Sequence, residues 1–422
     1  MHADLLVHNA GQLLTLAGGP QRGQRLGQLG LIEAGALAVE SGRLAAVGSS
    51  QALLDQFEAD STIDAAGRLV LPGFIDPHTH LIWAGDRADE FEQRTAGVPY
   101  LDILKQGGGI LATVRHTRQA SLDQLIADGR RRLQSMLELG TTTVEAKTGY
   151  GLNTETEIRM LAAILALDEE GPWDLVPTLL GAHAIPPEFE NRADDYVGYL
   201  IDDMLPAVRQ WWQANSDNRP LPFFDVFCEE GAFNLAQSRR MLQAAHKLGF
   251  PLKVHADEFA GLGGTALAVE LGATSVDHLV ETPEEDIKAL GGSITTAVSL
   301  PCTPFGLGQD RYTPAHDFLQ AGAVLAIATD LNPGTAPCES MQFAMAVACR
   351  RMKLTPAQAI AAATINAAAA IGRAENRGSL EPGKLADFLV MQVNDYRQLG
   401  YRFGGNLVGQ VFKNGKIVLD RT

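Results

Sequence analysis

The sequence lacks the features that mark secreted, membrane-spanning or nucleic-acid-binding proteins. It has only four cysteines in 422 residues, Cys228, Cys302, Cys338 and Cys349, and none of them forms a C-x-x-C pair. Four scattered thiols are not a disulfide framework, and they are typical of a reducing cytosol. Positive charge is also scarce, because 34 Lys and Arg face 50 Asp and Glu and the formal net charge is −16. This acidity argues against nucleic acid or an anionic membrane as a partner.

Long apolar runs and targeting segments are missing as well. The first residues contain neither a basic region nor a long apolar stretch, so no signal peptide is expected. The longest apolar tract, residues 359–371, is interrupted by Thr364 and Asn366 and is too short and too polar to span a bilayer. With 46% hydrophobic residues, the composition is that of a folded globular protein. We therefore expect a cytoplasmic protein with no membrane partner.

One pattern recurs through the middle of the chain. A helix ends at a glycine, a short apolar run follows, and the run ends on a polar residue; the glycines are Gly140, Gly171, Gly249, Gly272 and Gly322. Glycine is the usual residue just beyond a helix, and apolar runs without alternation suit strands that are buried on both faces. Repeated alternation of strands and helices predicts an α/β fold with a parallel sheet. About eight such units predict a (β/α)8 TIM barrel.

The two ends of the chain have a different pattern. Short strands are expected near residues 5–9, 35–39, 386–391 and 409–412, with hairpin turns at 40–43 and 413–416. The second turn contains Asn-Gly, the strongest short hairpin signal. Neither end has enough strands to bury a core alone. We therefore expect one small β-sandwich domain, built from residues 1–66 and 373–422, beside a barrel over residues 67–372.

Helix starts and one long loop can also be predicted. Capping boxes are expected at Thr154, Thr282 and Thr355, where a threonine is followed three residues later by Glu or Gln. Between His80 and Ser121 we expect a loop of about forty residues, and loops of that length in compact domains are usually functional. It contains the triple glycine at residues 107–109. A lid, or a contact with a second subunit, is the expected role.

Histidines gather where barrel strands should end. His78-Thr79-His80 follows the candidate first strand, residues 70–77. Residues two apart in a strand face the same side, so both rings should point into the barrel mouth, where they suit a metal ion. An H-x-H pair alone is weak evidence. Its weight rises because four more polar residues end later strands, the position of barrel active sites: His183, His255, His278 and Asp330. The alternative is that each is a satisfied buried polar group.

This arrangement resembles the amidohydrolase superfamily over essentially the whole chain. The shared pattern is H-x-H after strand one, a histidine after strands five and six, and an aspartate after strand eight; residues 383–388 match the return into the β domain. Finer motifs are similar to members that open an imidazolone ring in histidine degradation. They lie at residues 76–80, 107–115, 145–151, 255–259 and 329–334. The triple glycine and the Lys-Thr-Gly-Tyr-Gly run are the most specific of them.

The resemblance implies a single metal ion. Its ligands would be His78, His80, His255 and Asp330, which leave one position open for water. The ion would be divalent or trivalent, zinc or iron. Many relatives bridge two metals with a carboxylated lysine after strand four. Here that strand ends in Cys228-Glu229-Glu230, so one ion is expected, with a bridging Glu229 as the alternative.

The resemblance also implies roles around the metal. Asp330 would accept the proton of the water, His278 would shuttle protons, and Glu258 would touch the substrate ring. Arg87 would bind a propionate, although its spacing alone favours a solvated loop charge. The other substrate contacts would be Tyr150, His183, Asn332, Gly334 and Thr335. For Tyr150 and His183, a core tyrosine and a structural histidine are the alternatives.

The implied reaction is hydrolytic opening of 4-imidazolone-5-propanoate to N-formimidoyl-L-glutamate, by an enzyme that forms a homodimer. The nearest alternative is another amidohydrolase reaction, such as deamination of a heterocycle. A barrel without catalysis that serves as an assembly scaffold is a further alternative. Such a scaffold should lack the ligand residues, all of which are present in this sequence.

Overall fold

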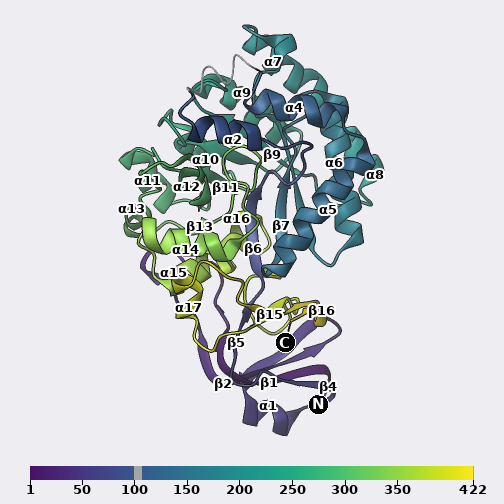
Figure 1. Cartoon of the computed structure of the whole chain (residues 1–422), viewed down its shortest axis with the longest axis vertical. Helices are drawn as coiled ribbons and strands as arrows, with labels where there is room; N and C mark the ends of the chain where they lie inside the picture. Colours follow the sequence, from purple (N-terminus) through teal and green to yellow (C-terminus); the bar gives the residue numbers. More distant parts are fainter. Residues whose placement is uncertain (99–106, 422) are drawn as a thin grey trace.

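The computed structural model describes residues 1–98 and 107–421, which form an α/β barrel with a small β domain at one end (Figure 1). The barrel strands are parallel, and their order in space follows their order in the sequence. They are β6 (Phe74–Thr79), β7 (Thr141–Lys147), β8 (Asp174–Ala182), β9 (Phe223–Cys228), β10 (Lys253–Ala256), β11 (Ser275–His278), β12 (Thr296–Ser299) and β13 (Leu325–Ile327). A backbone pairing between Thr79 and Leu331 brings the segment after β13 back against β6. The predicted (β/α)8 barrel is confirmed.

Helices cover the outside of the barrel, where each buries an apolar face against the strands. The longer ones are α5 (Leu122–Glu138), α6 (Thr154–Glu170), α8 (Leu205–Asn215), α9 (Leu235–Lys247), α10 (Gly264–Glu270), α11 (Glu284–Gly291), α13 (Ala315–Ala321), α14 (Met341–Arg351) and α15 (Pro356–Ala362). Shorter segments are η2 (Pro187–Phe189), α7 (Ala193–Tyr199), η3 (Leu200–Met204) and α12 (Cys302–Leu307). Every residue of β7 and β10 is buried, which explains why these strands show no apolar alternation.

The amino-terminal end of the barrel is closed by α16 (Ile365–Ala370). Ala367 and Ala368 pack there against Ile75 and Val176, and the Ile75 amide donates to the Ala363 carbonyl at 3.0 Å. The Ala-rich tract of the sequence is therefore a buried plug. In the described part of the chain, no helix is both long and apolar enough to cross a membrane.

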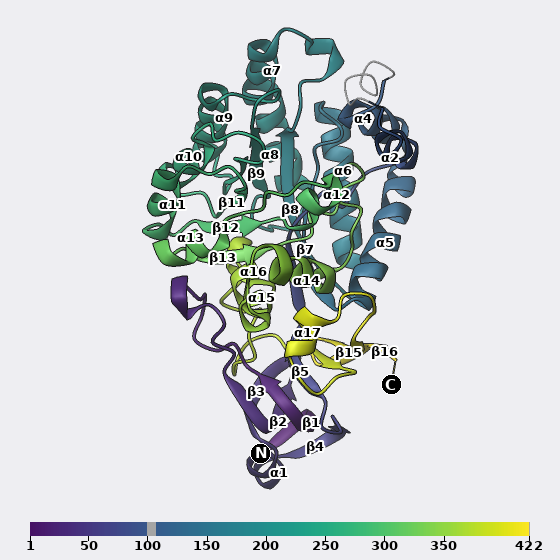
Figure 2. The ribbon, with the colours of Figure 1, turned by 60° about the vertical axis from the view of Figure 1, so that its left-hand side comes forward.

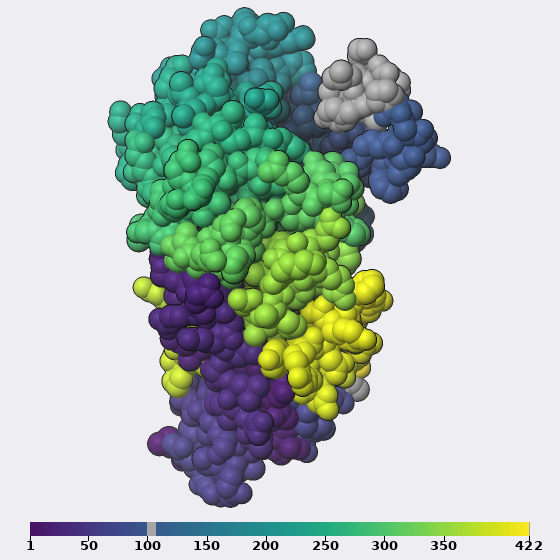
Figure 3. All heavy atoms as spheres, turned by 90° about the vertical axis from the view of Figure 1, so that its left-hand side faces the viewer, coloured from purple at the N-terminus to yellow at the C-terminus, as the bar shows by residue number. Residues whose placement is uncertain are grey.

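The β domain is one mixed sheet made from both ends of the chain. Its strands are β1 (His2–Leu14), β2 (Leu31–Glu40), β3 (Arg43–Ser49), β4 (Glu58–Asp64), β5 (Leu69–Pro72), β14 (Phe388–Met391), β15 (Val408–Lys413) and β16 (Lys416–Asp420). The sheet branches at β1, which pairs with β4 along its first part and with β5 further on. Helix α1 (Ser50–Gln56) and η1 (Gly23–Arg25) lie in its connections. The first and last segments of the chain lie side by side (Figure 3).

Both predicted hairpins are present in this sheet. Glu40 pairs with Arg43, and Lys413 pairs with Lys416. Asn414 and Gly415 have φ angles of 48° and 74°, as the primed turn of an Asn-Gly hairpin requires. Helix α17 (Arg397–Tyr401) packs on α14 and α15, at the junction of the two units (Figure 2). The predicted β domain from both chain ends is confirmed.

The single first strand predicted for residues 70–77 is wrong. The structure divides this segment at Gly73 into β5, which belongs to the β domain, and β6, which starts the barrel. The Gly73 amide donates to the Asp387 carbonyl at 3.0 Å, and a Cβ atom there would lie 2.3 Å from the Thr142 hydroxyl. The sheet of the β domain thus extends beyond residue 66, and the exact domain boundaries stay a prediction.

The forty-residue loop is also wrong as predicted, because it contains α2 (Ala88–Thr95) and α4 (Ile110–Gln119); residues 99–106 lie outside the described residues. The capping box at Thr355 is confirmed. The other two are wrong: Asn153, one residue earlier, caps α6, and α11 starts after Pro283 without a cap from any described side chain.

Candidate metal centre

Three imidazole rings meet at the carboxyl-terminal mouth of the barrel. His78 lies on β6, His80 directly follows it, and His255 lies on β10. One ring nitrogen of each lies within 4.8 Å of the others, and none of the three residues is more than 3% exposed. The His80 and His255 Nε2 atoms are 3.4 Å apart. The spacing of H-x-H and the position of His255 thus bring the rings together as predicted.

Asp330 completes this cluster from the segment after β13. Its Oδ1 lies 3.4 Å from the Nε2 atoms of both His78 and His80. The Thr303 hydroxyl donates to the other oxygen, Oδ2. Burial alone would raise the pKa of Asp330, but its contacts with His78 and His80 hold that pKa well below the usual value. Asp330 has a left-handed φ of 56°, a conformation that is uncommon for non-glycine residues.

These residues fit a metal ion. His78 Nε2 and Asp330 Oδ1 are both buried and have no hydrogen-bond partner in the described part of the chain. An unpartnered buried donor or acceptor is costly, and a cation between the two atoms would satisfy both. Three imidazole nitrogens and one carboxylate oxygen are a common ligand set for zinc and also suit iron.

Two buried aspartates fix how the ligand rings are turned. His78 Nδ1 lies 2.6 Å from Asp277 Oδ2, and His255 Nδ1 lies 2.9 Å from Asp225 Oδ2. A carboxylate can only accept, so Nδ1 of His78 carries the proton and its Nε2 keeps its lone pair for the cluster. His255 Nδ1 lies close to Asp225 but makes no hydrogen bond with a described residue. Sequence reasoning missed both aspartates, although each lies on a barrel strand: Asp277 is one residue before His278 at the end of β11, and Asp225 is three residues before Cys228 at the end of β9.

Beneath the histidines lies a fully buried network of charges. Lys147 Nζ donates to Glu145 at 2.7 Å and to Asp225 at 2.9 Å, and Lys253 Nζ lies 3.3 Å from Asp277. All five side chains have no exposed surface. Burial would lower the pKa of Lys147, but Asp225 and Glu145 raise it above its usual value. Lys147 therefore supports the metal site from below and does not bridge metals.

His278 and Glu258 lie together beside the cluster. His278 Nδ1 is 3.6 Å from Glu258 Oε2, and both side chains are at most 10% exposed. Burial raises the pKa of Glu258 well above its usual value, with Asp330 and Glu229 adding to the effect. Burial also lowers the pKa of His278 well below its usual value. Both shifts favour the uncharged forms of the carboxyl and of the imidazole.

His183 and Tyr150 form one wall of the site. The His183 ring stacks on His80 at 4.8 Å between centroids, and Tyr150 lies 5.3 Å from His183. The His183 Nδ1 atom lies 2.9 Å from the Gly149 carbonyl, so Nδ1 donates and Nε2 stays free. Burial raises the pKa of Tyr150, which keeps its hydroxyl neutral. Both predicted contact residues thus lie against a metal-ligand ring.

Arg87 lies at the edge of the site. Its Nη1 is so close to Gly334 that a Cβ atom there would lie 2.2 Å away. Its Nε and Nη2 donate to Glu90 Oε2 at 2.9 and 2.7 Å. The other oxygen of Glu90 accepts the Gly109 amide at 2.9 Å. Glu90, which sequence reasoning missed, therefore ties Arg87 to the triple-glycine segment.

Asn332 and Thr335 shape the turn that carries Gly334. The Asn332 amide donates to the Asp330 carbonyl at 2.7 Å and to the Thr335 hydroxyl at 2.9 Å. Its carbonyl oxygen accepts the amides of Gly334 and Thr335, both at 2.8 Å. These bonds hold the segment after Asp330 in a compact turn against Arg87.

Glu229 has a different position from the one that a bridging ligand needs. Its Oε2 accepts the Phe259 amide at 2.9 Å, and its Oε1 accepts the Glu230 amide at 2.9 Å. Glu229 holds the segment that carries Glu258.

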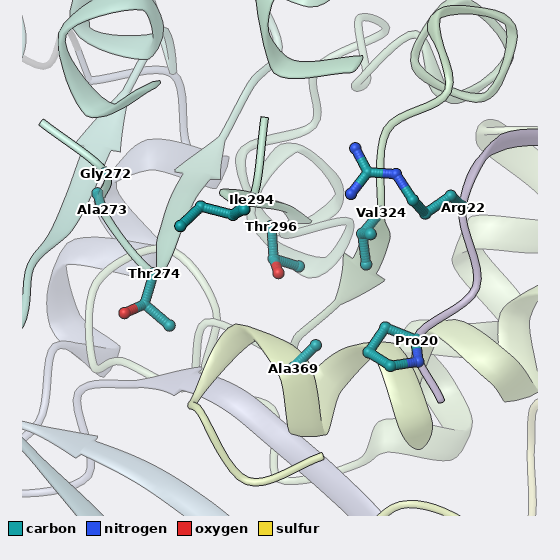
Figure 4. Close-up of a pocket in the computed structure, with 9 residues that line it drawn as sticks. All are labelled: Pro20, Arg22, Gly272, Ala273, Thr274, Ile294, Thr296, Val324 and Ala369. Atoms are coloured by element: carbon teal, nitrogen blue, oxygen red, sulfur yellow. The ribbon is translucent and has the colours of Figure 1, made fainter. Parts of the chain in front are cut away.

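A pocket of about 300 Å³ opens at the opposite end of the barrel (Figure 4). It lies where β11, β12 and β13 begin, between Thr274, Thr296 and Val324, and Arg22 borders it. The Arg22 guanidinium donates to the carbonyls of Gly291 and Ser293. This pocket lacks the titratable cluster found at the other end, so we place the chemistry at the histidines.

Comparison with known sequences gives matches along nearly the whole chain. Residues 69–418 match the amidohydrolase family. An imidazolonepropionase from Herpetosiphon aurantiacus is 52% identical over 417 residues, which cover 99% of this chain and 97% of that protein. One from Chloroflexus aggregans is 50% identical over 420 residues, covering 99% and 98%.

Solved structures share the architecture at much lower identity. A zinc-bound adenosine deaminase from Xanthomonas campestris has a TM-score of 0.71 at 21% identity, covering 99% of this chain and 93% of its own. Guanine deaminase from E. coli has a TM-score of 0.74 at 16% identity, covering 99% of both chains. At such identities these likenesses show the fold alone.

Proposed function

Because the chain belongs to the amidohydrolase family and, within it, to the imidazolonepropionases, we propose that it hydrolyses 4-imidazolone-5-propanoate to N-formimidoyl-L-glutamate. The reaction adds water across an amide C–N bond of the ring and opens it. The chain is a metal-dependent hydrolase, and its site must therefore hold an ion, place a water and move protons to a leaving nitrogen.

His78, His80, His255 and Asp330 would hold the metal ion. When bound, the ion supplies Lewis acidity, which makes water nucleophilic near neutral pH and polarises a carbonyl group. We propose one ion per chain, zinc or iron. The carboxylate of Glu229 supports this number, because both of its oxygens already accept backbone amides.

Two sets of groups would move protons. Asp330 would accept the proton of the attacking water and return it to the leaving ring nitrogen, while Thr303 donates to its Oδ2. Glu258 lies 3.6 Å from Nδ1 of His278. His278 would stabilise the negative charge on the carbonyl oxygen and would shuttle protons as an acid or base.

The remaining residues would position the substrate. Arg87 pairs with the propionate, as a guanidinium pairs bidentately with a carboxylate. Tyr150 and His183 line the ring, and Glu258 contacts it from the other side. Asn332, Gly334 and Thr335 form the turn at the product end.

One observation carries this proposal: a buried His78 Nε2 and a buried Asp330 Oδ1, each without a partner in the described chain, lie beside the Glu258–His278 pair. The test is a direct assay of the metal-loaded protein with 4-imidazolone-5-propanoate. We expect loss of the imidazolone absorbance and formation of N-formimidoyl-L-glutamate, identified by mass spectrometry. Release of ammonia instead would support deamination of a heterocycle.

We further propose a cytoplasmic homodimer with a small-molecule substrate. The acidic composition, with a net charge of −16, supports a freely diffusing enzyme. Sedimentation of the metal-loaded protein at micromolar concentration tests the dimer.

A further inference from the structure

Two of the four cysteines touch each other next to the site. Cys302 begins α12 just after β12, and Cys338 lies between the Asn332 turn and α14. Their sulfur atoms are 3.8 Å apart, although 36 residues separate them in the sequence. We infer that Cys302 and Cys338 are a modification site: a peroxide joins them in a reversible disulfide, and this bond inactivates the enzyme. The inactivation rests on the proposed function, whereas the bond itself does not.

The two thiols are suited to different steps of such a reaction. Cys302 is 2% exposed, whereas Cys338 is partly exposed and can meet a small oxidant. Their mutual hydrogen bond lowers the pKa of Cys338 and raises that of Cys302. Burial raises the pKa of Cys228 and of Cys349 to about 11 each. Because the thiolate is the reactive form, Cys338 reacts first.

The balanced reaction needs one peroxide and no other reagent. The Cys338 thiolate attacks one oxygen of hydrogen peroxide, the O–O bond breaks, and hydroxide leaves and takes a proton to become water. The resulting sulfenic acid is attacked by the Cys302 sulfur, the S–O bond breaks, and a second water leaves. Two thiols lose two electrons, and the peroxide gains them.

Formation of the Cys302–Cys338 disulfide would displace neighbouring residues of the site. A disulfide holds its sulfur atoms about 2.05 Å apart, closer than the 3.8 Å between the two thiols, so side-chain rotation together with a shift of the two segments closes the gap. Thr303 follows Cys302 directly and donates to Asp330. In the same helix, a Cβ atom on Gly306 would lie 1.9 Å from the Thr335 carbonyl, so α12 packs closely against the Asn332 turn, and a shift of α12 would disturb that turn. Displacements of about 1 Å can cost a factor of about 10² in rate.

The test treats the metal-loaded enzyme with hydrogen peroxide, blocks the remaining thiols, and digests it without reductant. Trypsin should release Cys302 and Cys338 on separate peptides, but Cys349 shares the peptide of Cys338 because no Lys or Arg lies between them. The mapping is therefore done in Cys349→Ser. We expect a Cys302–Cys338 linked peptide, an activity loss of tenfold or more with metal content unchanged, and recovery with dithiothreitol.

Three variants make the proposal falsifiable. Cys302→Ser and Cys338→Ser should keep their activity after peroxide, while Cys349→Ser should lose it like the wild type; Cys302→Ala serves if the serine misfolds. No linked peptide, or equal inactivation of Cys302→Ser, would overturn the site. A linked peptide with full activity would overturn the inactivation. Because peptide mapping needs no substrate, it tests the disulfide even if the imidazolone assay shows no activity.

Discussion

His78 Nδ1 and Asp277 Oδ2 are 2.6 Å apart in the buried floor of the site. This contact determines which nitrogen of the His78 ring faces the other ligands, because a carboxylate accepts only from a protonated nitrogen. Asp277 is in turn 3.3 Å from Lys253 and accepts the Ser275 hydroxyl at 2.6 Å. The geometry of the metal site therefore depends on residues that never touch the metal.

The first prediction follows from this contact. Asp277→Asn keeps the shape of the side chain but removes the charge that favours the Nδ1–H form of His78. Metal affinity should fall by about 10–100-fold, the usual effect of losing such a partner. Competition with a chelator measures it. Asp257→Asn is the matched control, because Asp257 is also buried but accepts from Thr265 and not from a histidine; equal losses in both variants would contradict the role of Asp277.

The second prediction concerns Lys147, which neutralises Glu145 and Asp225 where no water reaches them. Lys147→Met should destabilise the fold by roughly 3–5 kcal/mol, because it leaves buried charges unpaired. Urea unfolding of the metal-free protein measures the change. Arg130→Met, which removes the exposed pair with Glu170, should cost only about 0–1 kcal/mol.

Lys147→Met can be checked further with a second change. Adding Glu145→Gln removes one of the stranded carboxylates and should restore part of the stability. A double variant as unstable as the single one would show that the charges are not what Lys147 contributes.

The third prediction concerns the ligands. His78→Ala removes one of four ligands, so the protein should lose its metal and its activity. It should stay folded, because the apolar core around the strands does not depend on the ion. Wild-type protein should carry one equivalent of metal by elemental analysis. Two equivalents would contradict the single-ion proposal.

The barrel and the meeting of its strand-end histidines could be predicted from the sequence because their signals are local. Glycines end helices, apolar runs form strands, and residues at strand ends meet at the barrel mouth. His78, His80, His255 and Asp330 met there because topology alone brings strand ends together. The Asn414-Gly415 hairpin was predictable for a similar reason, since the turn type requires those residues.

What could not be predicted depends on distant contacts. The pairing of His78 with Asp277 spans 199 residues, and nothing local marks Asp277 as its partner. Gly73 divides the predicted first strand because Thr142 occupies the space of a Cβ, which is a fact of packing. Thr154 matched the capping-box pattern, but the N-cap of α6 is the preceding residue, Asn153, because asparagine is also a favoured N-cap residue.

The fourth prediction concerns His278, which lies beside His78 and His255. If His278 is not a ligand, as we propose, His278→Asn should keep the metal while kcat falls by roughly 10²–10⁴, the usual contribution of general acid–base catalysis. Metal content and steady-state kinetics measure the two effects separately. If the variant purifies without metal, His278 is a ligand and not a free proton carrier.

The last prediction concerns how the substrate is chosen. The propionate is its only full charge, and Asp330 would repel it, so a cation must hold it away from the metal. Arg87 is at the right edge of the site, and Glu90 occupies its Nε and Nη2 while Nη1 lies against Gly334. Truncating one partner of a desolvated charge pair costs roughly 2–5 kcal/mol. Arg87→Met should therefore lower kcat/KM by about 10²-fold or more, with metal content unchanged.

Arg87→Lys should recover only part of the lost kcat/KM, because an ammonium cannot reproduce the fork of a guanidinium. Arg130→Met, at the surface, is the control. Wild-type kcat/KM in Arg87→Met would mean that another group binds the carboxylate.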